Sequence, residues 1–427
     1  MIVGLMFLGL VALILLNVPI AIALGVVAMA AMAWSSGMDS LLNAAIVMFT
    51  GATSFPLLAI PLFILAGAIM NSSSLSRRLI AFASALFGFV RGGLAMITIG
   101  TSMFFAEISG SAVADVAAMG SILIPAMKRR GYPKEFAAAV MSSSATLAVI
   151  IPPSIPMILY AVMADTSVVK IFVAGIVPGI LAGGLMMGTA YWYARRCNYP
   201  VEESFQWKRV KQTFREAAWA FLLPVIILGG IFGGIVTATE GAALAVLAAL
   251  FIGGVIYREL NLRHLYDAMV EGVTQTAIVM LLVAASALLG VYLTEQRIPQ
   301  ELALWLSSIT HNRYAVLAIL NIFFLVVGLF LHSAAAIILV VPIVMPLVRA
   351  VGIDPVHFGL IVTLNLGIGQ QTPPVASVLM ASCSIAKADM WKVTRVNLPF
   401  IGILVALLLV VTYVPAVPMG LVNLFYH

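Results

Sequence analysis

The chain has 427 residues, of which 9% are charged and 63% are apolar, and its mean hydropathy is +1.15. A soluble chain carries roughly a quarter charged residues, so this composition excludes soluble enzymes, nucleic-acid binders and secreted scaffolds. Apolar runs long enough to cross a hydrocarbon core of ~30 Å recur from end to end, and we expect an all-α polytopic membrane protein. The net charge of +6 needs no anionic partner, because Lys and Arg collect in the cytoplasmic loops of membrane proteins.

The first half of the chain predicts a pair of spans, a third span, a short charged helix, a hairpin, a broken span and a last span. These elements are expected at 2–16, 18–34, 55–71, 73–90, 94–127, 135–163 and 171–194. The opening run lacks a basic stretch and a small-residue cleavage site, so we expect a first span rather than a removable signal peptide. Each arm of the hairpin is shorter than the ~20 residues of a spanning helix, which favours a re-entrant hairpin.

A linker over 198–216 separates the two halves. Trp207, Val210 and Phe214 share one helical face, and the basic residues around them lie mostly off that face. This pattern is typical of an amphipathic helix lying in the membrane interface.

The second half predicts the same series of elements. They are expected at 217–236, 241–257, 272–293, 298–311, 315–348, 358–386 and 396–420. Glu240 stands just before the second of these spans, and we interpret it as a structural residue at a helix start.

Prolines indicate that the second half repeats the first. Four of them recur at a constant offset of 221 residues: Pro125, Pro152, Pro153 and Pro178 return as Pro346, Pro373, Pro374 and Pro399. We therefore predict two repeats, 1–197 and 217–427. Each half has an odd number of full crossings, so the second repeat should enter the membrane inverted, as in many secondary transporters. The basic loops agree with this arrangement and place both termini in the periplasm.

The hairpin tips and the Pro-Pro motifs are the places where polar backbone is expected at mid-membrane. The tips are predicted at 107–111 and 330–334, and each Pro-Pro motif removes two backbone donors and breaks its span. A broken helix offers free carbonyls to Na⁺ and a helix N-terminus to a carboxylate. We therefore predict two related ion sites with an anionic substrate between them.

Two ionisable residues near the tips have competing interpretations. Asp115 lies inside an apolar run, which makes it a candidate for function, but it could equally cap the second arm of its hairpin. His332 is expected to donate a hydrogen bond at its tip rather than to carry a proton.

Six sequence blocks resemble the large membrane (M) subunit of tripartite ATP-independent periplasmic (TRAP) transporters. They are FPLLAIPLFILAG (55–67), EISGSAVADVAAMGSILIPAM (107–127), GYPKEFAAAV (131–140), IIPPSIPMILYAV (150–162), FVAGIVPGI (172–180) and GIVTATEGAALAV (234–246). The resemblance implies a Na⁺-driven importer in the bacterial inner membrane, with a scaffold and a transport domain that moves as an elevator. It also implies a periplasmic substrate-binding protein (P type) that delivers an organic acid, and a small four-helix membrane subunit (Q type). The block around Asp115 looks most like the sialic-acid members.

Carried onto this sequence, the resemblance assigns two sodium sites. The first comprises Ser109, Gly110 and Ser111 with Ser142, Ser143, Ser144 and Thr146, and the second comprises His332 and Ser333 with Gly367, Gly369, Gln370 and Thr372. The candidate substrate-binding residues are Asp115, Pro153, Ser154, Gln371 and Pro374. Two or more sodium ions and no organic cofactor are expected.

Two other classes of function are alternatives. A stand-alone Na⁺/anion symporter of the dicarboxylate/sodium symporter type shares the inverted-hairpin plan. Its tips carry Ser-Asn-Thr, whereas these read Ser-Gly-Ser and His-Ser-Ala. An intramembrane enzyme is disfavoured because H-E-x-x-H and G-x-S-x-G motifs are lacking. The chain also lacks a P-loop motif, so ATP is not expected to be its direct energy source.

Overall fold

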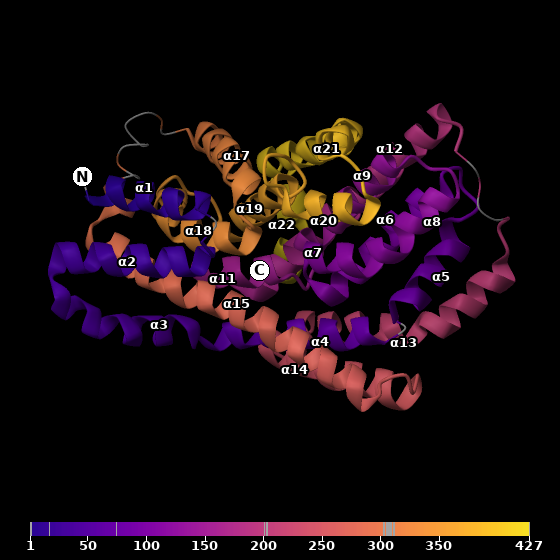
Figure 1. Ribbon diagram of the computed structural model, residues 1–427, viewed down its shortest axis with the longest axis horizontal. Coiled ribbons are helices and arrows are strands. Elements are labelled where there is room, and N and C mark those ends of the chain that lie inside the picture. Colours follow the sequence, from indigo (N-terminus) through magenta and orange to yellow (C-terminus); the bar gives the residue numbers. More distant parts are fainter. Residues whose placement is uncertain are drawn as a thin grey trace.

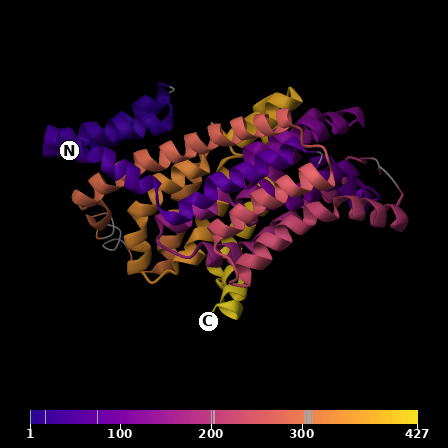
Figure 2. The same cartoon turned by 90° about the horizontal axis from the view of Figure 1, so that it is seen from below.

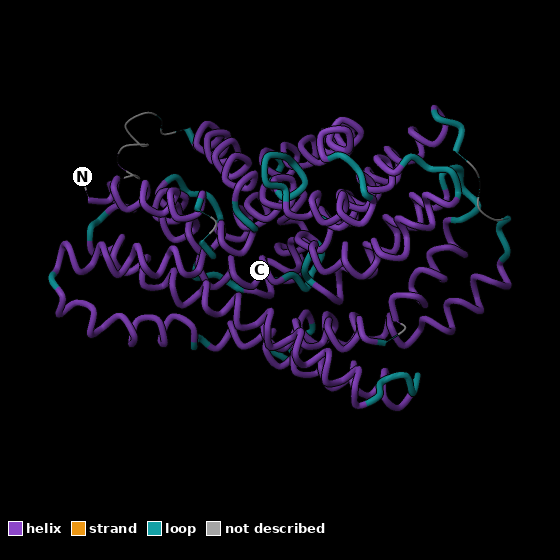
Figure 3. Tube along the Cα trace, viewed as in Figure 1, coloured by secondary structure: helices purple, strands orange, loops and turns teal. Residues whose placement is uncertain are grey.

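The computed structural model describes residues 2–16, 18–73, 75–199, 201, 204–301, 304, 310 and 312–426. Over these residues the chain is helical, and its one isolated β-bridge joins Arg91 to Val201. Eight described helices are long and apolar enough to cross a membrane, or nine if one bent pair counts as a single span. The predicted all-α polytopic class is therefore confirmed, and loop segments interrupt the helices near the middle of the molecule as well as at its ends (Figure 3).

The N-terminal elements contain one helix more than the sequence predicted. They are α1 (Ile2–Leu15), α2 (Ile20–Ser36), η1 (Met38–Asn43), α3 (Ala44–Ala52), η2 (Phe55–Leu58), α4 (Ala59–Ser72) and α5 (Leu75–Phe87). The additional helical segment, η1 with α3, was missed because its apolar run is shorter than a membrane span. Helix α3 packs on α15, as α2 and α4 also do.

The remaining elements of the first half follow the prediction closely. The hairpin consists of α6 (Gly93–Ser109) and a returning arm made of α7 (Ala112–Asp115), the π-helical η3 (Val116–Gly120) and α8 (Ser121–Arg129). The broken span consists of α9 (Lys134–Ala145), α10 (Leu147–Ile150) and α11 (Ile155–Met163), with a bend of 42° at the break. Helix α12 (Val168–Arg196) completes this half.

The second half differs from the prediction at its two ends. Helix α13 (Trp207–Phe232) runs without interruption through residue 216, so the part of the linker from Trp207 onward and the following span are one helix. No helix-breaking residue separates the two parts, because Glu216, Ala217 and Ala218 all favour helix. The expected last span also ends early, since α21 (Met390–Tyr413) is followed by a separate α22 (Ala416–Phe425), which projects from the helical bundle in Figure 2.

Between these ends lie the second hairpin and the second broken span. The elements are α14 (Ala238–Phe251), η4 (Ile252–Ile256), α15 (Leu262–Glu295), α17 (Arg313–Phe330), α18 (Ser333–Ala350), α19 (Pro355–Gly369) and α20 (Ser377–Ala386). The short helix expected at 298–311 falls largely outside the described residues.

The recurring prolines occupy corresponding elements of the two halves. Pro125 and Pro346 lie inside the returning arms of the two hairpins, and Pro178 and Pro399 lie inside α12 and α21. Both Pro-Pro bonds are cis and lie in the breaks. The order hairpin, broken helix, long helix is thus repeated, whereas the inverted relation of the repeats stays a prediction.

The helices pack into two groups. Helices α2, α3, α4 and α14 pack on α15 or on α4, and we call this group the α15 bundle. Helices α9, α17, α19, α20 and α21 pack on one another and form the α19 bundle. In Figure 1 the α15 bundle occupies the lower part of the molecule and the α19 bundle the upper part, with the first hairpin between them on the right.

Candidate functional site

The first hairpin tip rests on the break of the first broken helix. The chain turns at Gly110, which has φ +58°. A Cβ atom added to Gly110 would lie 3.2 Å from the carbonyl oxygen of Pro153 and 3.3 Å from the amide nitrogen of Ile155. Only glycine adopts this backbone conformation without cost and still allows the two segments to approach so closely.

The second tip approaches the second break in a similar way. The Val375 amide, within the break, donates to the carbonyl of Leu329 near the end of α17 at 3.2 Å. The backbones of α17 and α19 touch at Gly328 and Gly369, where an added Cβ on Gly369 would lie 2.5 Å from the Gly328 carbonyl carbon. Each half therefore brings one tip against one break, as the sequence predicted.

His332 makes a capping hydrogen bond at its tip. The side chain caps α18, because its Nδ1 accepts a hydrogen bond from the Ala334 amide at 3.4 Å. A neutral imidazole that accepts at Nδ1 carries its proton on Nε2. The predicted donor role of His332 therefore stays a prediction.

The two broken helices meet at the centre of the molecule. A Cβ atom added to Gly367 would lie 3.8 Å from the carbonyl oxygen of Thr146 and 3.9 Å from the side chain of Val149. The breaks of the two halves therefore belong to one site rather than to two separate regions.

A central cavity of about 530 Å³ lies between the tips and the α15 bundle. Five of the predicted sodium-site residues line it: Gly110, Ser111, His332, Ser333 and Gln370. The opposite wall comes from α2, α4 and α15 and includes Asn71, Glu271 and Gln275. Among the described residues no Lys or Arg lines this cavity. The side chain of Ser109 lies outside the described part of the chain.

Other predicted sodium-site residues form a buried polar cluster behind the cavity. Ser143 Oγ lies 2.6 Å from Gln371 Oε1 and 2.5 Å from Asn397 Oδ1, and Asn397 Nδ2 donates to Gln371 Oε1 at 3.1 Å. All three side chains are fully buried. The serine hydroxyl has one hydrogen and can satisfy only one of the two amide oxygens, while Gln371 Nε2 is a buried donor without a partner among the described residues.

Neighbouring serines and threonines make mostly local hydrogen bonds. Ser102 donates to Ser144 across α6 and α9 at 3.0 Å, Thr146 donates to the Ser143 carbonyl at 2.6 Å, and Thr372 donates to the Ile368 carbonyl at 2.8 Å. Within the described residues, Ser142 Oγ, Asn365 Oδ1 and Gln370 Oε1 are buried and have no hydrogen-bond partner.

These oxygens fit a monovalent cation better than a transition metal. Hydroxyl, amide and carbonyl oxygens at helix breaks are the ligands that sodium takes in secondary transporters. The described residues contain no group of three or more His, Cys, Asp or Glu side chains that could hold a metal ion.

The predicted substrate-binding residues lie outside the cavity wall. Asp115, Ser154 and Gln371 are fully buried, and Ser154 donates to the Val149 carbonyl at 3.0 Å. Pro153 is buried, whereas Pro374 is exposed. The cavity wall beside the break is made instead by Val149, Ile155, Pro156 and Gln370. A substrate contact at the predicted positions therefore stays a prediction.

Several polar residues of the site were missed by sequence reasoning. Asn397 joins the cluster around Ser143, and a second buried chain links three helices, because Asn365 donates to Asn321 at 2.7 Å and Asn321 donates to Thr412 at 3.0 Å. Glu271 and Gln275 were also missed. The available signal was a polar residue inside an apolar run, as in VEGVTQTAIV at 270–279.

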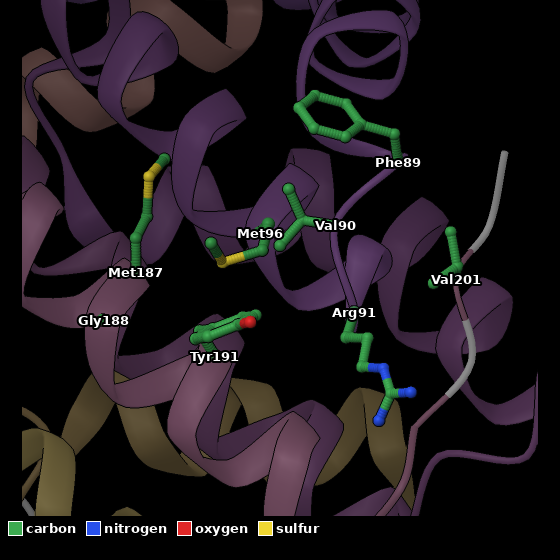
Figure 4. Close-up of a pocket in the computed structure, with 8 residues that line it drawn as sticks. All are labelled: Phe89, Val90, Arg91, Met96, Met187, Gly188, Tyr191 and Val201. Atoms are coloured by element: carbon green, nitrogen blue, oxygen red, sulfur yellow. The ribbon is translucent and has the colours of Figure 1, made fainter. Parts of the chain in front are cut away.

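Two further cavities lie outside this site. A polar cleft of about 760 Å³ adjoins the central cavity, sharing Asn71, Ala114, Ala117 and Glu271 with it, and is also lined by Arg77, Glu259 and His264. A separate cavity of about 710 Å³ lies between the α5–α6 turn and α12 (Figure 4). The separate cavity contains none of the residues predicted to bind sodium or substrate.

Comparisons with known proteins agree with the geometry. Residues 7–417 match the model of the family described as tripartite ATP-independent periplasmic transporter, DctM component. The isethionate TRAP transporter permease protein DctMQ of Oleidesulfovibrio alaskensis is 43% identical over 94% of this chain, which spans only 64% of that relative's length. The C4-dicarboxylate TRAP transporter large permease protein DctM of Pseudomonas aeruginosa is 39% identical over 90% of each protein.

A further relative and a solved structure are also similar to this chain, the structure in its fold alone. The 2,3-diketo-L-gulonate TRAP transporter large permease protein of Escherichia coli is 36% identical over 94% of each protein. The crystal structure of the Alcanivorax borkumensis YdaH transporter, described as having an unusual topology, shares the fold with a TM-score of 0.66 at 15% identity, over 90% of this chain and 89% of that one. The named relatives are transporter permeases rather than enzymes. This multi-pass membrane chain therefore belongs to the DctM component family of tripartite ATP-independent periplasmic transporters.

Proposed function

We propose that this chain is the translocating subunit of a TRAP transporter and carries a small organic anion into the cell together with Na⁺. The observation that carries the proposal is the central cavity, because both hairpin tips and Gln370 of the second break line one space. Two tips and two breaks that meet at one place can hold an anion and its cations side by side.

Sodium coupling is supported by the oxygen-rich surroundings of the breaks. Ser142 Oγ and Gln370 Oε1 are buried polar oxygens without partners in the described structure, and Ser143 Oγ lies close to two amide oxygens. Buried polar atoms without partners are costly unless an ion or water satisfies them. Two or more sodium ions remain our proposal for this chain.

The proposed substrate class is a small organic acid. The named relatives carry isethionate, C4-dicarboxylates and 2,3-diketo-L-gulonate, which are anions of similar size. Sialic acid belongs in the same test panel because of the sequence around Asp115. A cavity of about 530 Å³ is large enough for any of them.

The proposed mechanism is an elevator in which the α19 bundle and both hairpins move against the α15 bundle. A small membrane subunit of the Q type and a periplasmic binding protein of the P type complete the transporter in the bacterial inner membrane. The family description, which makes this chain one component of a tripartite system, supports these partners. Periplasmic termini remain part of the same proposal.

The proposed function is tested by reconstituting the chain with its small subunit into liposomes and adding the binding protein outside. We expect uptake of a labelled organic acid that requires an inward Na⁺ gradient and is lost when K⁺ replaces Na⁺. Full transport without Na⁺ would contradict sodium coupling. Full transport without the binding protein would favour a stand-alone symporter instead.

A further inference from the structure

The central cavity contains one formally charged side chain among the described residues, and its charge is negative. Glu271 of α15 lines the cavity and is exposed to it, while His332 is the other titratable group on the wall. The cavity is proposed to hold an anion, and the Glu271 carboxylate would repel that anion. Its role must therefore be other than direct binding of the substrate. Within the described part of the chain, Glu271 has no ion pair.

Glu271 belongs to a small group of oxygen-bearing side chains on the α15 bundle. Gln275 follows one helical turn later and lines the same cavity. Gly272 between them packs against Leu65 of α4, where an added Cβ would lie 3.3 Å from Leu65 Cδ1. Asn71, further along α4, also lines the cavity, and its Oδ1 is buried and has no hydrogen-bond partner among the described residues.

Across the central cavity no positive charge faces Glu271 among the described residues. The returning arm of the first hairpin contributes Ala112, Ala114 and Ala117 opposite it, which carry no charge. In the adjoining cleft, Glu259 is paired with Arg78 at 2.8 Å. Arg77 and His264 line the cleft together with Glu271 but form no ion pair with it, and they do not line the central cavity.

Glu271 therefore stands where the cleft opens into the cavity, since it lines both. A carboxylate at this junction attracts cations and repels anions. One carboxylate with two amide oxygens suits a monovalent cation, whereas Ca²⁺ takes six to eight oxygens and often several carboxylates.

We propose that Glu271, with Gln275 and Asn71, forms a sodium-binding site on the α15 bundle, distinct from the sites at the hairpin tips. Sodium bound there balances the Glu271 charge and lets the anion share the cavity. The site thereby makes occupation of the cavity by substrate depend on sodium. This inference rests on the proposed Na⁺-coupled function.

The test measures uptake in proteoliposomes as a function of Na⁺ concentration, at constant ionic strength. Glu271→Gln should raise the Na⁺ concentration for half-maximal uptake by roughly three- to tenfold, equivalent to about 0.7–1.4 kcal/mol. Glu271→Asp should restore most of the sodium affinity. Glu295→Gln is the matched control, because Glu295 lies at the other end of the same helix and does not line the cavity.

Gln275→Met provides a second variant that keeps the charge and removes one amide oxygen. We expect a smaller rise in the half-maximal Na⁺ concentration, with an unchanged melting temperature. An unchanged Na⁺ dependence in folded Glu271→Gln protein would overturn the proposed site. Tighter substrate binding by Glu271→Gln at an unaltered sodium affinity would also overturn it. That result would mean that the Glu271 carboxylate only repels the substrate anion and binds no sodium. Sodium-independent uptake by the wild-type protein would instead remove the proposed function itself.

Discussion

At the scale of single residues, the site depends on glycine positions where a Cβ atom would be too close to a neighbouring segment. Gly110 combines a left-handed backbone with close contacts to Pro153 and Ile155. The sequence placed this glycine at a hairpin tip, but the contact across to the break follows only from the packing of the hairpin on α10 and α11.

Replacement of this residue is therefore expected to be costly. Gly110→Ala should destabilise the protein by about 1–2 kcal/mol, because the left-handed conformation disfavours a Cβ and the break lies too close. The melting temperature in detergent and the rate of uptake should both fall. Gly184→Ala is the control, because nothing lies within 4 Å of a Cβ added there, inside α12. Equal melting temperatures and uptake rates for the two variants would contradict close packing of the hairpin tip on the break.

At the scale of elements, sequence and structure agree where the signals are local. The sequence places Glu240 at a helix start, and the structure confirms this with a capping box in which Thr237 and Glu240 bond each other's backbone amides. The amphipathic stretch at Trp207 was also recognised, but it is the first part of α13 rather than a separate helix. Its boundary was wrong because amphipathicity does not report where a helix ends.

Hydrogen bonds between polar side chains lead to a prediction about the stability of the α19 bundle. Ser143 of α9 and Asn397 of α21 lie in one cluster with Gln371 of the second break. A double-mutant cycle of Ser143→Ala and Asn397→Ala should give a coupling energy of about 0.6–1.7 kcal/mol, the range found between membrane helices.

Reversible unfolding in mixed micelles would measure this coupling. The control cycle pairs Ser143→Ala with Thr412→Val, because Thr412 lies on the same helix as Asn397 but bonds Asn321 instead. The control coupling should be close to zero. If both cycles give the same value, α9 and α21 are not linked through the Ser143 cluster.

At the scale of the whole molecule, the first hairpin faces the α15 bundle across the polar cleft, and both hairpin tips face it across the central cavity. The cleft has a polar wall from α4, α5 and α15 and a wall of small residues from the returning arm of the first hairpin. That wall carries Ala114, Ala117, Ala118 and Ser121, with Ile122 as its one large side chain. This surface is consistent with the proposed elevator.

A cross-link across the cleft should therefore stop transport. Ser72→Cys and Ala117→Cys lie on opposite walls, in a background where Cys197 and Cys383 are replaced. A reducible bifunctional reagent should abolish uptake, and reduction should restore it. Gly25→Cys with Ala285→Cys is the control, because an added Cβ on Gly25 lies 3.8 Å from Ala285 Cβ, within the α15 bundle and in range for a disulfide. Uptake that survives the cleft cross-link would contradict the elevator.

The sequence alone determined the membrane class, both hairpins, both breaks and the family resemblance. Hydropathy and the backbone limits of proline and glycine act over a few neighbouring residues, so they can be read along the chain. Only the tertiary structure decided which polar side chains share a space. It buried Asp115, brought Asn397 to Ser143, and set Glu271 on the cavity wall. The side of a helix that faces a cavity depends on partners hundreds of residues away, and the local pattern does not record them.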